Sequence, residues 1–201
     1  MNITKVFEPF EHVIVDNMYT EDELALIWRE IYFLKNKFED PSKTGSALDE
    51  KGKEKKENTA LFIDNVFSDR KFSDILNVNK KAFCRDLIEA VASMHPAYGI
   101  ARVCNLDHTI INYYGDGCYY KPHLDETVFT FITFLMQDSC GYTGGDFLFP
   151  DHDYLVQQKN NRVIVFPGCI SHQVTEVKLH TPVSEGRFSM AQFLSIREKN
   201  T

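Results

Sequence analysis

Three residues constrain the fold of this chain more than any other feature: His123, Asp125 and His172. Side chains of a β-strand alternate between its two faces, so a His-x-Asp pair places an imidazole and a carboxylate on the same face of an extended segment. His172 lies 49 positions after His123 (172 − 123). It can join that pair only in a fold that brings a distant strand back to the same place.

Two imidazoles and one carboxylate on one face of a metal leave the other coordination positions open, which is the arrangement of non-haem Fe(II) oxygenases. The open positions allow O2, a co-substrate and water to reach the metal. A His-x-Asp pair alone is weak evidence, because a chain with seven histidines can contain one by chance on a surface strand. The residues around the pair favour the metal site over that alternative.

Residues 114–125 fit the pattern YxxGxxYxxHxD at every fixed position. With this motif the chain resembles the 2-oxoglutarate/Fe(II)-dependent dioxygenases, and among them the prolyl 4-hydroxylase-like branch. The resemblance covers residues 8–195 and is specific from Tyr114 onward. Further along, residues 144–150 (GGDFLFP) are similar to the family's GGxxxFP segment, and residues 171–174 resemble the strand that presents the distal histidine.

The resemblance implies that His123, Asp125 and His172 are the metal ligands and form the catalytic centre. It implies Fe(II) as cofactor, 2-oxoglutarate and O2 as co-substrates, and ascorbate as a stimulant of turnover. The expected reaction hydroxylates an unactivated C–H bond and releases succinate and CO2. Iron and 2-oxoglutarate carry that chemistry, while the protein supplies geometry and excludes competing reactions.

The resemblance also implies a co-substrate site on the last strand, where residues 186–189 have the sequence GRFS. Arg187 is expected to bind the far carboxylate of 2-oxoglutarate, since a guanidinium fork matches a carboxylate bidentately. Ser189 faces the same side of the strand and can donate a second hydrogen bond. Tyr114 is expected to hydrogen-bond the same carboxylate, although a shift of one residue in register would place Tyr113 there instead.

One spacing in the C-terminal half departs from the family pattern. Arg187 lies 15 positions after His172 (187 − 172), which is longer than usual. The additional residues, 179–185, contain Pro and turn formers, so they predict a lengthened hairpin loop. Arg162 and Arg197 are the alternatives for the role of Arg187, since they are the other arginines late in the chain.

The order of the predicted elements favours a single α+β domain with a double-stranded β-helix, or jelly-roll, core. Residues 1–100 are predicted to form a helical support region. Its first helix follows the capping box Thr20–Glu23, and its second helix ends before Pro96. An apolar segment at residues 7–15 predicts a strand. Residues 101–201 contain many short strand patterns and are predicted to form the catalytic jelly roll.

Residues 39–58 have no apolar period and are rich in Lys and Glu, with Gly45 and Gly52 among them. This composition predicts a long flexible insert. The insert is either a solvated loop or a lid over the substrate, and the sequence leaves both open.

Charge and composition narrow the partners. The net charge of −7 argues against a nucleic-acid partner, because proteins that bind nucleic acid usually carry a basic patch. The sequence has no apolar run of membrane-spanning length and no signal-peptide core, so we expect a cytoplasmic protein without a membrane partner. The five cysteines form no CxxC motif and are expected to be reduced thiols. The oligomeric state stays open.

Three functions fit these observations. The first is hydroxylation of a prolyl residue in a peptide or protein. The second is the same chemistry on a free amino acid or another small molecule, and the third is a non-catalytic jelly-roll protein that binds metal or sugar. The triad together with Arg187 disfavours the third, because binding alone needs neither open metal positions nor the cation. The motif of residues 114–125 favours the first over the second.

Overall fold

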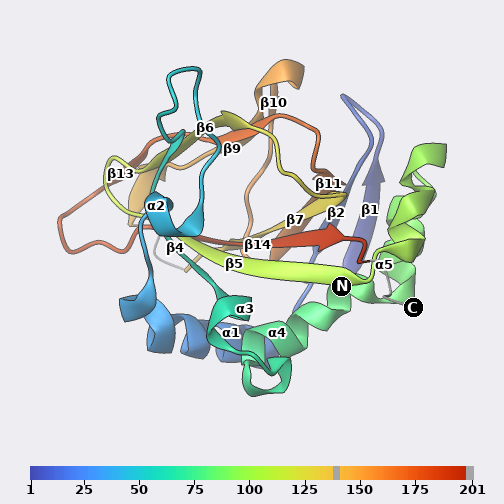
Figure 1. Ribbon diagram of the computed structural model, residues 1–201, viewed down its shortest axis with the longest axis horizontal. Helices are drawn as coiled ribbons and strands as arrows, with labels where there is room; N and C mark the ends of the chain where they lie inside the picture. Colours follow the sequence, from blue (N-terminus) through green and yellow to red (C-terminus); the bar gives the residue numbers. More distant parts are fainter. Residues whose placement is uncertain (138–140, 198–201) are drawn as a thin grey trace.

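Two antiparallel sheets and a layer of helices make up the computed structural model, which describes residues 1–137 and 141–197 (Figure 1). The larger sheet has seven strands in the order β1-β2-β11-β7-β14-β5-β4, and the smaller sheet has five in the order β10-β9-β12-β6-β3. Strands β13 and β8 form a separate pair. This arrangement is the α+β double-stranded β-helix that the sequence predicted.

The strands are β1 Asn2–Val6, β2 His12–Asp16, β3 Lys56–Glu57, β4 Thr59–Phe62, β5 Leu106–Tyr114, β6 Tyr119–His123, β7 Phe129–Leu135, β8 Tyr142–Gly144, β9 Phe147–Phe149, β10 Tyr154–Leu155, β11 Arg162–Pro167, β12 His172–Val174, β13 Val177–Leu179 and β14 Arg187–Ser195. The α-helices are α1 Glu21–Leu34, α2 Pro41–Thr44, α3 Ile63–Val66, α4 Asp74–Val78 and α5 Arg85–Ala92. Short 3-10 helices are η1 Lys35–Lys37, η2 Arg70–Phe72, η3 Asn79–Phe83, η4 Pro96–Val103 and η5 Pro150–His152.

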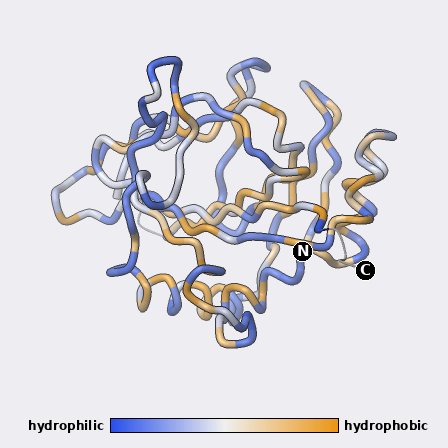
Figure 2. Tube along the Cα trace, in the orientation of Figure 1, coloured by the Kyte–Doolittle hydropathy of each residue, from blue (hydrophilic) through white to orange (hydrophobic). Residues whose placement is uncertain are grey.

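Helix α1 begins at the predicted capping box. Thr20 Oγ1 accepts a hydrogen bond from the Glu23 backbone N–H at 3.3 Å, and the Glu23 carboxylate accepts one from the Thr20 N–H at 2.8 Å. Four apolar side chains at helical spacing form its buried face: Leu24, Ile27, Ile31 and Leu34. With α4 and α5 they cover the outer face of the larger sheet, where hydrophobic segments concentrate (Figure 2).

Strand β7 lies inside the larger sheet and is buried on both faces. Phe129, Phe131 and Leu135 belong to the apolar core under the helices, whereas Ile132 and Phe134 belong to the core between the two sheets. The alternation follows from the period of two along a strand. The larger sheet therefore separates a helix-packed core from the interior of the β-helix.

The neighbouring strands β14 and β5 divide their side chains in the same way. On β14, Phe188 and Met190 pack toward the helices, whereas Arg187 and Ser189 line a pocket on the interior side. Arg187 is the direct partner of Tyr114 of β5 in the sheet register. One strand thus contributes both to the core and to the pocket.

The apolar segment at residues 7–15 is not the single strand that the sequence predicted. It forms the turn and second strand of a β1–β2 hairpin, with Pro9 in the connection. Proline has no backbone N–H to donate to a ladder, so it suits a turn better than a strand interior.

The predicted insert at residues 39–58 contains regular structure, namely α2, an isolated bridge between Leu48 and Glu54, and β3, which pairs with β6. Polar side chains close its turns. Asp49 Oδ1 accepts backbone hydrogen bonds from Lys51 at 2.9 Å and from Lys53 at 2.8 Å. Such local side-chain bonds form turns without any apolar period. Its mobility stays a prediction.

The described part of the chain has no helix that is long and apolar enough to cross a membrane. Its cysteines are free thiols, as the sequence predicted: Cys84, Cys104, Cys118 and Cys169. The fifth cysteine, Cys140, lies outside the described residues.

Candidate metal and co-substrate site

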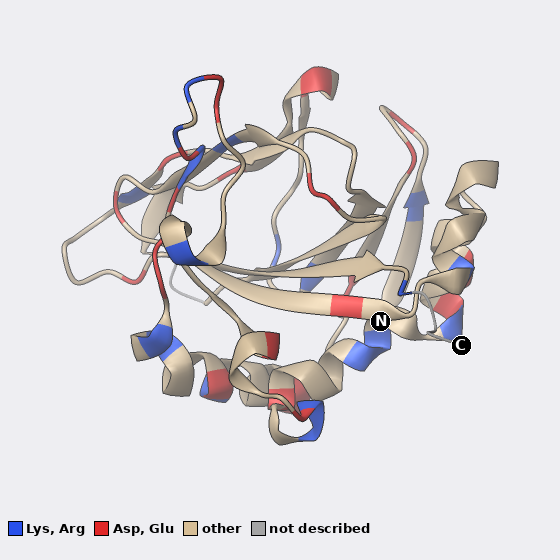
Figure 3. Ribbon diagram, viewed as in Figure 1, with Lys and Arg blue, Asp and Glu red and all other residues tan. Residues whose placement is uncertain are grey.

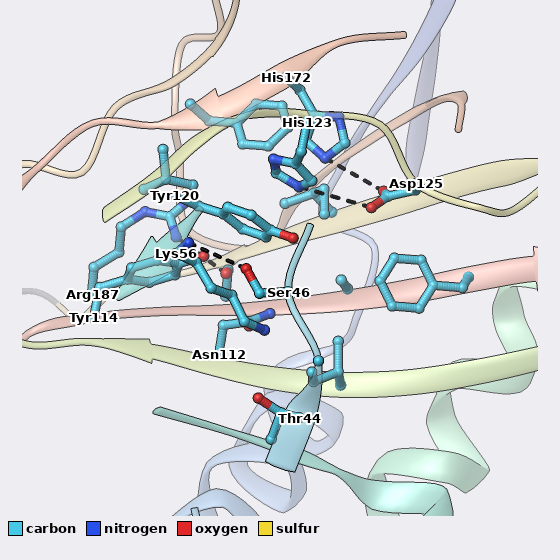
Figure 4. A pocket seen from close by; sticks show the side chains of 18 of the residues that line it. Thr44, Ser46, Lys56, Asn112, Tyr114, Tyr120, His123, Asp125, His172 and Arg187 are labelled. Carbon is cyan, nitrogen blue, oxygen red and sulfur yellow. Dashed lines mark hydrogen bonds and ion pairs between the residues drawn. The ribbon is translucent and has the colours of Figure 1, made fainter. Parts of the chain in front are cut away.

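The structure brings His123, Asp125 and His172 together. His123 ends β6, Asp125 follows in the turn, and His172 begins β12, the strand that pairs with β6. The Asp125 carboxylate oxygens lie 3.8 Å from His123 Nε2 and 3.4 Å from His172 Nε2 (Figure 4). Among the described residues this is the one group of three His, Cys, Asp or Glu side chains whose ligand atoms lie within 4.8 Å of one another.

Hydrogen bonds orient all three side chains. The Nδ1 atom of each imidazole bonds to the backbone carbonyl two residues before it, at 2.9 Å for His123 and 3.0 Å for His172. A carbonyl only accepts, so Nδ1 carries the proton and Nε2 keeps its lone pair. Thr130 Oγ1 donates to Asp125 Oδ2 at 2.6 Å and fixes the carboxylate. These hydrogen bonds hold the three side chains with their ligand atoms close together.

The imidazole of His123 is held neutral. Burial, and after it the neighbouring His172 imidazole, lowers the pKa of His123 to about 2. Tyr120 stacks on the same ring with centroids 3.4 Å apart and an interplanar angle of 9°, which restrains its orientation. Two imidazoles and a carboxylate are the donor set of non-haem Fe(II) sites, so these residues fit that ion.

Arg187 lies in the same pocket and is 1% exposed. Its Nη1 donates to Ser189 Oγ at 3.1 Å and its Nε to Gln158 Oε1 at 3.2 Å, while Nη2 has no hydrogen-bond partner within the described structure. Gly145 leaves room for the side chain, since a Cβ there would lie 2.7 Å from Arg187 Cδ. Burial lowers the pKa of this guanidinium, but an arginine stays charged. The unpaired N–H suits an anionic group of a bound molecule.

Tyr114 faces the interior beside this guanidinium. Its ring centroid lies 5.3 Å from Arg187 Cζ, and its side chain lines the pocket. Tyr113 points to the other face of β5 and packs on Phe188 with ring centroids 4.8 Å apart. Of the two tyrosines, Tyr114 is therefore the one that a molecule in the pocket can contact.

The other late arginines lie elsewhere. Arg162 makes a two-point ion pair with Asp16, at 2.8 and 3.0 Å, and Arg197 follows β14; neither lines the pocket. The lengthened loop before Arg187 is docked by Glu185, whose carboxylate accepts a hydrogen bond from Lys35 Nζ at 2.7 Å. The loop thus closes on the segment after α1, and β14 still begins at Arg187.

Four residues of the site had no role in the sequence interpretation: Lys56, Asn112, Thr130 and Gln158. Asn112 lies two positions before Tyr114 on β5, so strand periodicity could have found it. Thr130 is concealed within an apolar run. Lys56 and Gln158 come from segments without a periodic pattern, and only the tertiary structure brings them to the pocket.

Comparison with known proteins agrees with this geometry. Residues 109–195, which include the three-residue cluster and Arg187, match the model of the 2OG-Fe(II) oxygenase superfamily. No curated protein sequence matches the chain.

Several solved structures share the fold. A prolyl-4-hydroxylase from Pseudomonas putida is 14% identical, with a TM-score of 0.65 and 92% of each chain covered. The viral collagen prolyl hydroxylase from Paramecium bursaria Chlorella virus-1, solved as a 2OG complex, is 13% identical, with a TM-score of 0.56 over 92% of this chain and 96% of that chain. A 2OG-Fe(II) oxygenase family protein from Burkholderia pseudomallei is 14% identical, with a TM-score of 0.54 over 92% and 84%.

At these identities the structural likeness shows the fold, and the family match adds the chemistry of the site. The region that carries the site, residues 109–195, belongs to the 2OG-Fe(II) oxygenase superfamily, and the chain has the fold of prolyl 4-hydroxylases.

Proposed function

We propose that this Fe(II)- and 2-oxoglutarate-dependent oxygenase hydroxylates a prolyl residue in a peptide or protein, with His123, Asp125 and His172 as metal ligands. The observation that carries the proposal is that the three-ligand cluster shares one pocket with Arg187, a buried guanidinium whose Nη2 has no partner in the described ranges. When bound, Fe(II) supplies the oxidation chemistry, in which 2-oxoglutarate and O2 yield succinate and CO2 and one oxygen atom enters a substrate C–H bond.

The three residues would hold Fe(II) and would leave its other coordination positions to the reactants. His123 and His172 coordinate through Nε2, because their Nδ1 protons are engaged by backbone carbonyls. Thr130 keeps the Asp125 carboxylate in place through its 2.6 Å hydrogen bond. The three side chains are therefore already oriented for binding one ion.

Arg187 binds the far carboxylate of 2-oxoglutarate through Nη2, with Ser189 and Tyr114 as neighbouring hydroxyl donors. The Ser189 hydroxyl already accepts from Arg187 Nη1, so its own proton is free to point toward the co-substrate. Apolar side chains, among them Phe147 and Val174, also line the pocket.

A prolyl substrate is supported by the motif of residues 114–125 and by two similar structures, a prolyl-4-hydroxylase and a viral collagen prolyl hydroxylase. Proline also favours the extended polyproline II conformation, which lowers the entropy lost on docking in a groove. A free amino acid or another small molecule is the alternative substrate. A non-catalytic metal or sugar-binding role has no support from the family match.

The charge distribution supports a substrate other than nucleic acid. Acidic and basic side chains are interspersed along the helices and the hairpin between α2 and β3, in a chain with a net charge of −7 (Figure 3). Binding to a phosphate backbone needs a concentration of positive charge. A cytoplasmic location stays a prediction from the sequence.

The test is mass spectrometry of proline-containing peptides incubated with enzyme, Fe(II), 2-oxoglutarate and ascorbate, with succinate measured in parallel. We expect one added oxygen atom on proline and an equal amount of succinate. Asp125→Ala should abolish both products, whereas Asp16→Ala, far from the pocket, should not. Oxidation of free L-proline or another metabolite, with every peptide inert, would transfer the assignment to the small-molecule alternative.

A further inference from the structure

Lys56 is a buried cation without an anionic partner. It is 6% exposed and is the one lysine among the described residues that is buried. Its ammonium group makes no hydrogen bond or ion pair in the described structure, and the nearest aromatic ring, that of Tyr120, lies 5.5 Å from Nζ. Its side chain lines the same pocket as Arg187 and the His123–Asp125–His172 cluster (Figure 4).

Such a group is costly in a folded protein. Moving an ammonium out of water is unfavourable unless an opposite charge compensates. Burial accordingly lowers the pKa of Lys56 to about 8, although nearby Glu54 and Asp125 act in the opposite direction. The ammonium is still mostly protonated at neutral pH. A core position would be filled more stably by Met or Leu, so a lysine here points to a bound partner.

With Fe(II) and 2-oxoglutarate bound, the site would still contain no net negative charge to balance Lys56. Fe(II) and the Asp125 carboxylate together carry one positive charge. The dianion 2-oxoglutarate together with Arg187 carries one negative charge, and these two cancel. Lys56 then provides the one remaining positive charge in the pocket, since no other buried lysine or arginine lines it. A monoanionic group would neutralise it.

Asn112 provides a second donor in the same pocket. Its Oδ1 accepts a hydrogen bond from Asn58 Nδ2 at 3.0 Å, so the amide oxygen is engaged. Its Nδ2 has no acceptor among the described residues, and the residue lines the pocket. An ammonium and an amide N–H form a suitable donor pair for the two oxygens of a carboxylate.

The chain fixes Lys56 at this position through the hairpin that precedes it. Ser46 Oγ accepts from the backbone N–H groups of Lys55 at 3.1 Å and of Lys56 at 3.3 Å. The hydroxyl of Tyr120, whose ring stacks on His123, accepts a hydrogen bond from the Ala47 N–H at 3.1 Å. These hydrogen bonds join the hairpin to the site and hold Lys56 in the pocket.

We propose that Lys56, with Asn112, binds a carboxylate of the substrate, so that this enzyme acts on an anionic substrate. This inference rests on the proposed function, because it assigns the substrate class of the same site. Both carboxylates of 2-oxoglutarate already have partners, one at the metal and one at Arg187, which leaves the substrate as the source of the anion. The carboxylate belongs either to an acidic residue beside the oxidised one in a peptide, or to a free amino acid.

The experiment uses full-length enzyme loaded with Mn(II) and N-oxalylglycine, an unreactive analogue of 2-oxoglutarate, and measures binding by calorimetry. Two matched pairs are titrated: acetyl-Pro-Glu-amide against acetyl-Pro-Gln-amide, and L-proline against L-prolinamide. We expect the carboxylate member of one pair to bind about tenfold or more tightly. Lys56→Met should abolish that preference and Lys56→Arg should retain part of it. Lys178→Met, which removes an exposed lysine of β13, should leave it intact.

The possible results distinguish between the two sources of the carboxylate and test the role of Lys56. A preference in the first pair identifies an acidic peptide, and a preference in the second identifies a free amino acid. Equal binding within both pairs, including no binding by any compound, would overturn the inference. Weaker binding of N-oxalylglycine by Lys56→Met would also overturn it, since Lys56 would then serve the co-substrate. If the carboxylate preference is present but no compound is hydroxylated with Fe(II) and 2-oxoglutarate, the proposed function fails while the role of Lys56 stands.

Discussion

Replacing Arg187 with methionine should separate co-substrate binding from stability. The side chain is 1% exposed, and Nη2 is free to bind 2-oxoglutarate. Removing one partner of a buried, hydrogen-bonded charge pair costs about 2–5 kcal/mol. At ~1.4 kcal/mol per tenfold change, the dissociation constant for 2-oxoglutarate should rise roughly 30-fold to several thousand-fold. Arg187→Lys should be intermediate, because it keeps the charge but loses the planar fork.

The same substitution should not destabilise the ligand-free protein. Arg187→Met removes a buried cation with an unpaired N–H, which should stabilise the folded protein. It also leaves Ser189 and Gln158 each without a hydrogen-bond donor, which should destabilise it. Replacing buried charges with apolar side chains of similar size is often neutral or stabilising. The melting temperature without ligand should therefore be unchanged or higher, while the increase in melting temperature on adding 2-oxoglutarate should disappear.

The assay is calorimetric titration of Mn(II)-loaded enzyme with 2-oxoglutarate, combined with thermal unfolding. Arg162→Met is the matched control. It breaks the ion pair with Asp16 far from the pocket, so it should lower the melting temperature and leave 2-oxoglutarate binding unchanged. Wild-type affinity in Arg187→Met would refute the assignment and require another cation for the co-substrate.

Three further predictions concern the metal, pH and the insert. Single alanine variants of His123, Asp125 and His172 should each weaken Fe(II) binding in anaerobic titration, and near-wild-type affinity in all three would disprove the metal site. His12→Phe should reduce the loss of melting temperature between pH 7.5 and pH 5.5. Burial lowers the pKa of His12 in the folded protein, whereas in the unfolded chain it is about 6.5. As the pH falls below about 6.5 the unfolded chain binds the proton first, so the folded state loses stability. An unchanged loss would mean that other groups cause it. Limited proteolysis should cut first within residues 39–58, and 2-oxoglutarate with substrate should protect them; absence of protection would favour a solvated loop over a lid.

Local rules predicted the parts of this fold that depend on neighbours in sequence. The capping box at Thr20 determines where α1 begins, because its hydrogen bonds span three residues. Period-two alternation placed Ser189 and Arg187 on one face of β14 without any tertiary information. The His-x-Asp spacing identified the first two members of the His123–Asp125–His172 cluster, although Asp125 lies in the turn after β6 and not on the strand.

Features that depend on distant contacts were missed or left open. Lys56 reaches the pocket only because β3 pairs with β6, more than sixty positions later in the chain, and nothing in its charged surroundings marks it as buried. Residues 7–15, which form the turn and most of β2, were interpreted as one strand, since Phe7 and Phe10 near Pro9 conceal the turn. Asn112 was within reach of strand periodicity, but its role depends on its partner Asn58.

The division of β14 into two faces has a consequence for engineering this enzyme. Ala191 and Phe193 line the pocket, whereas Met190 and Leu194 belong to the core under the helices. A library that randomises Phe193, which is only partly buried, should therefore sample new substrate preferences with less loss of expressed protein. A library at Met190 and Leu194 should mostly yield aggregates, because changes in a close-packed core create cavities or clashes. Along this one strand, positions that can be varied to change selectivity therefore alternate with positions that must be kept to maintain the yield of folded protein.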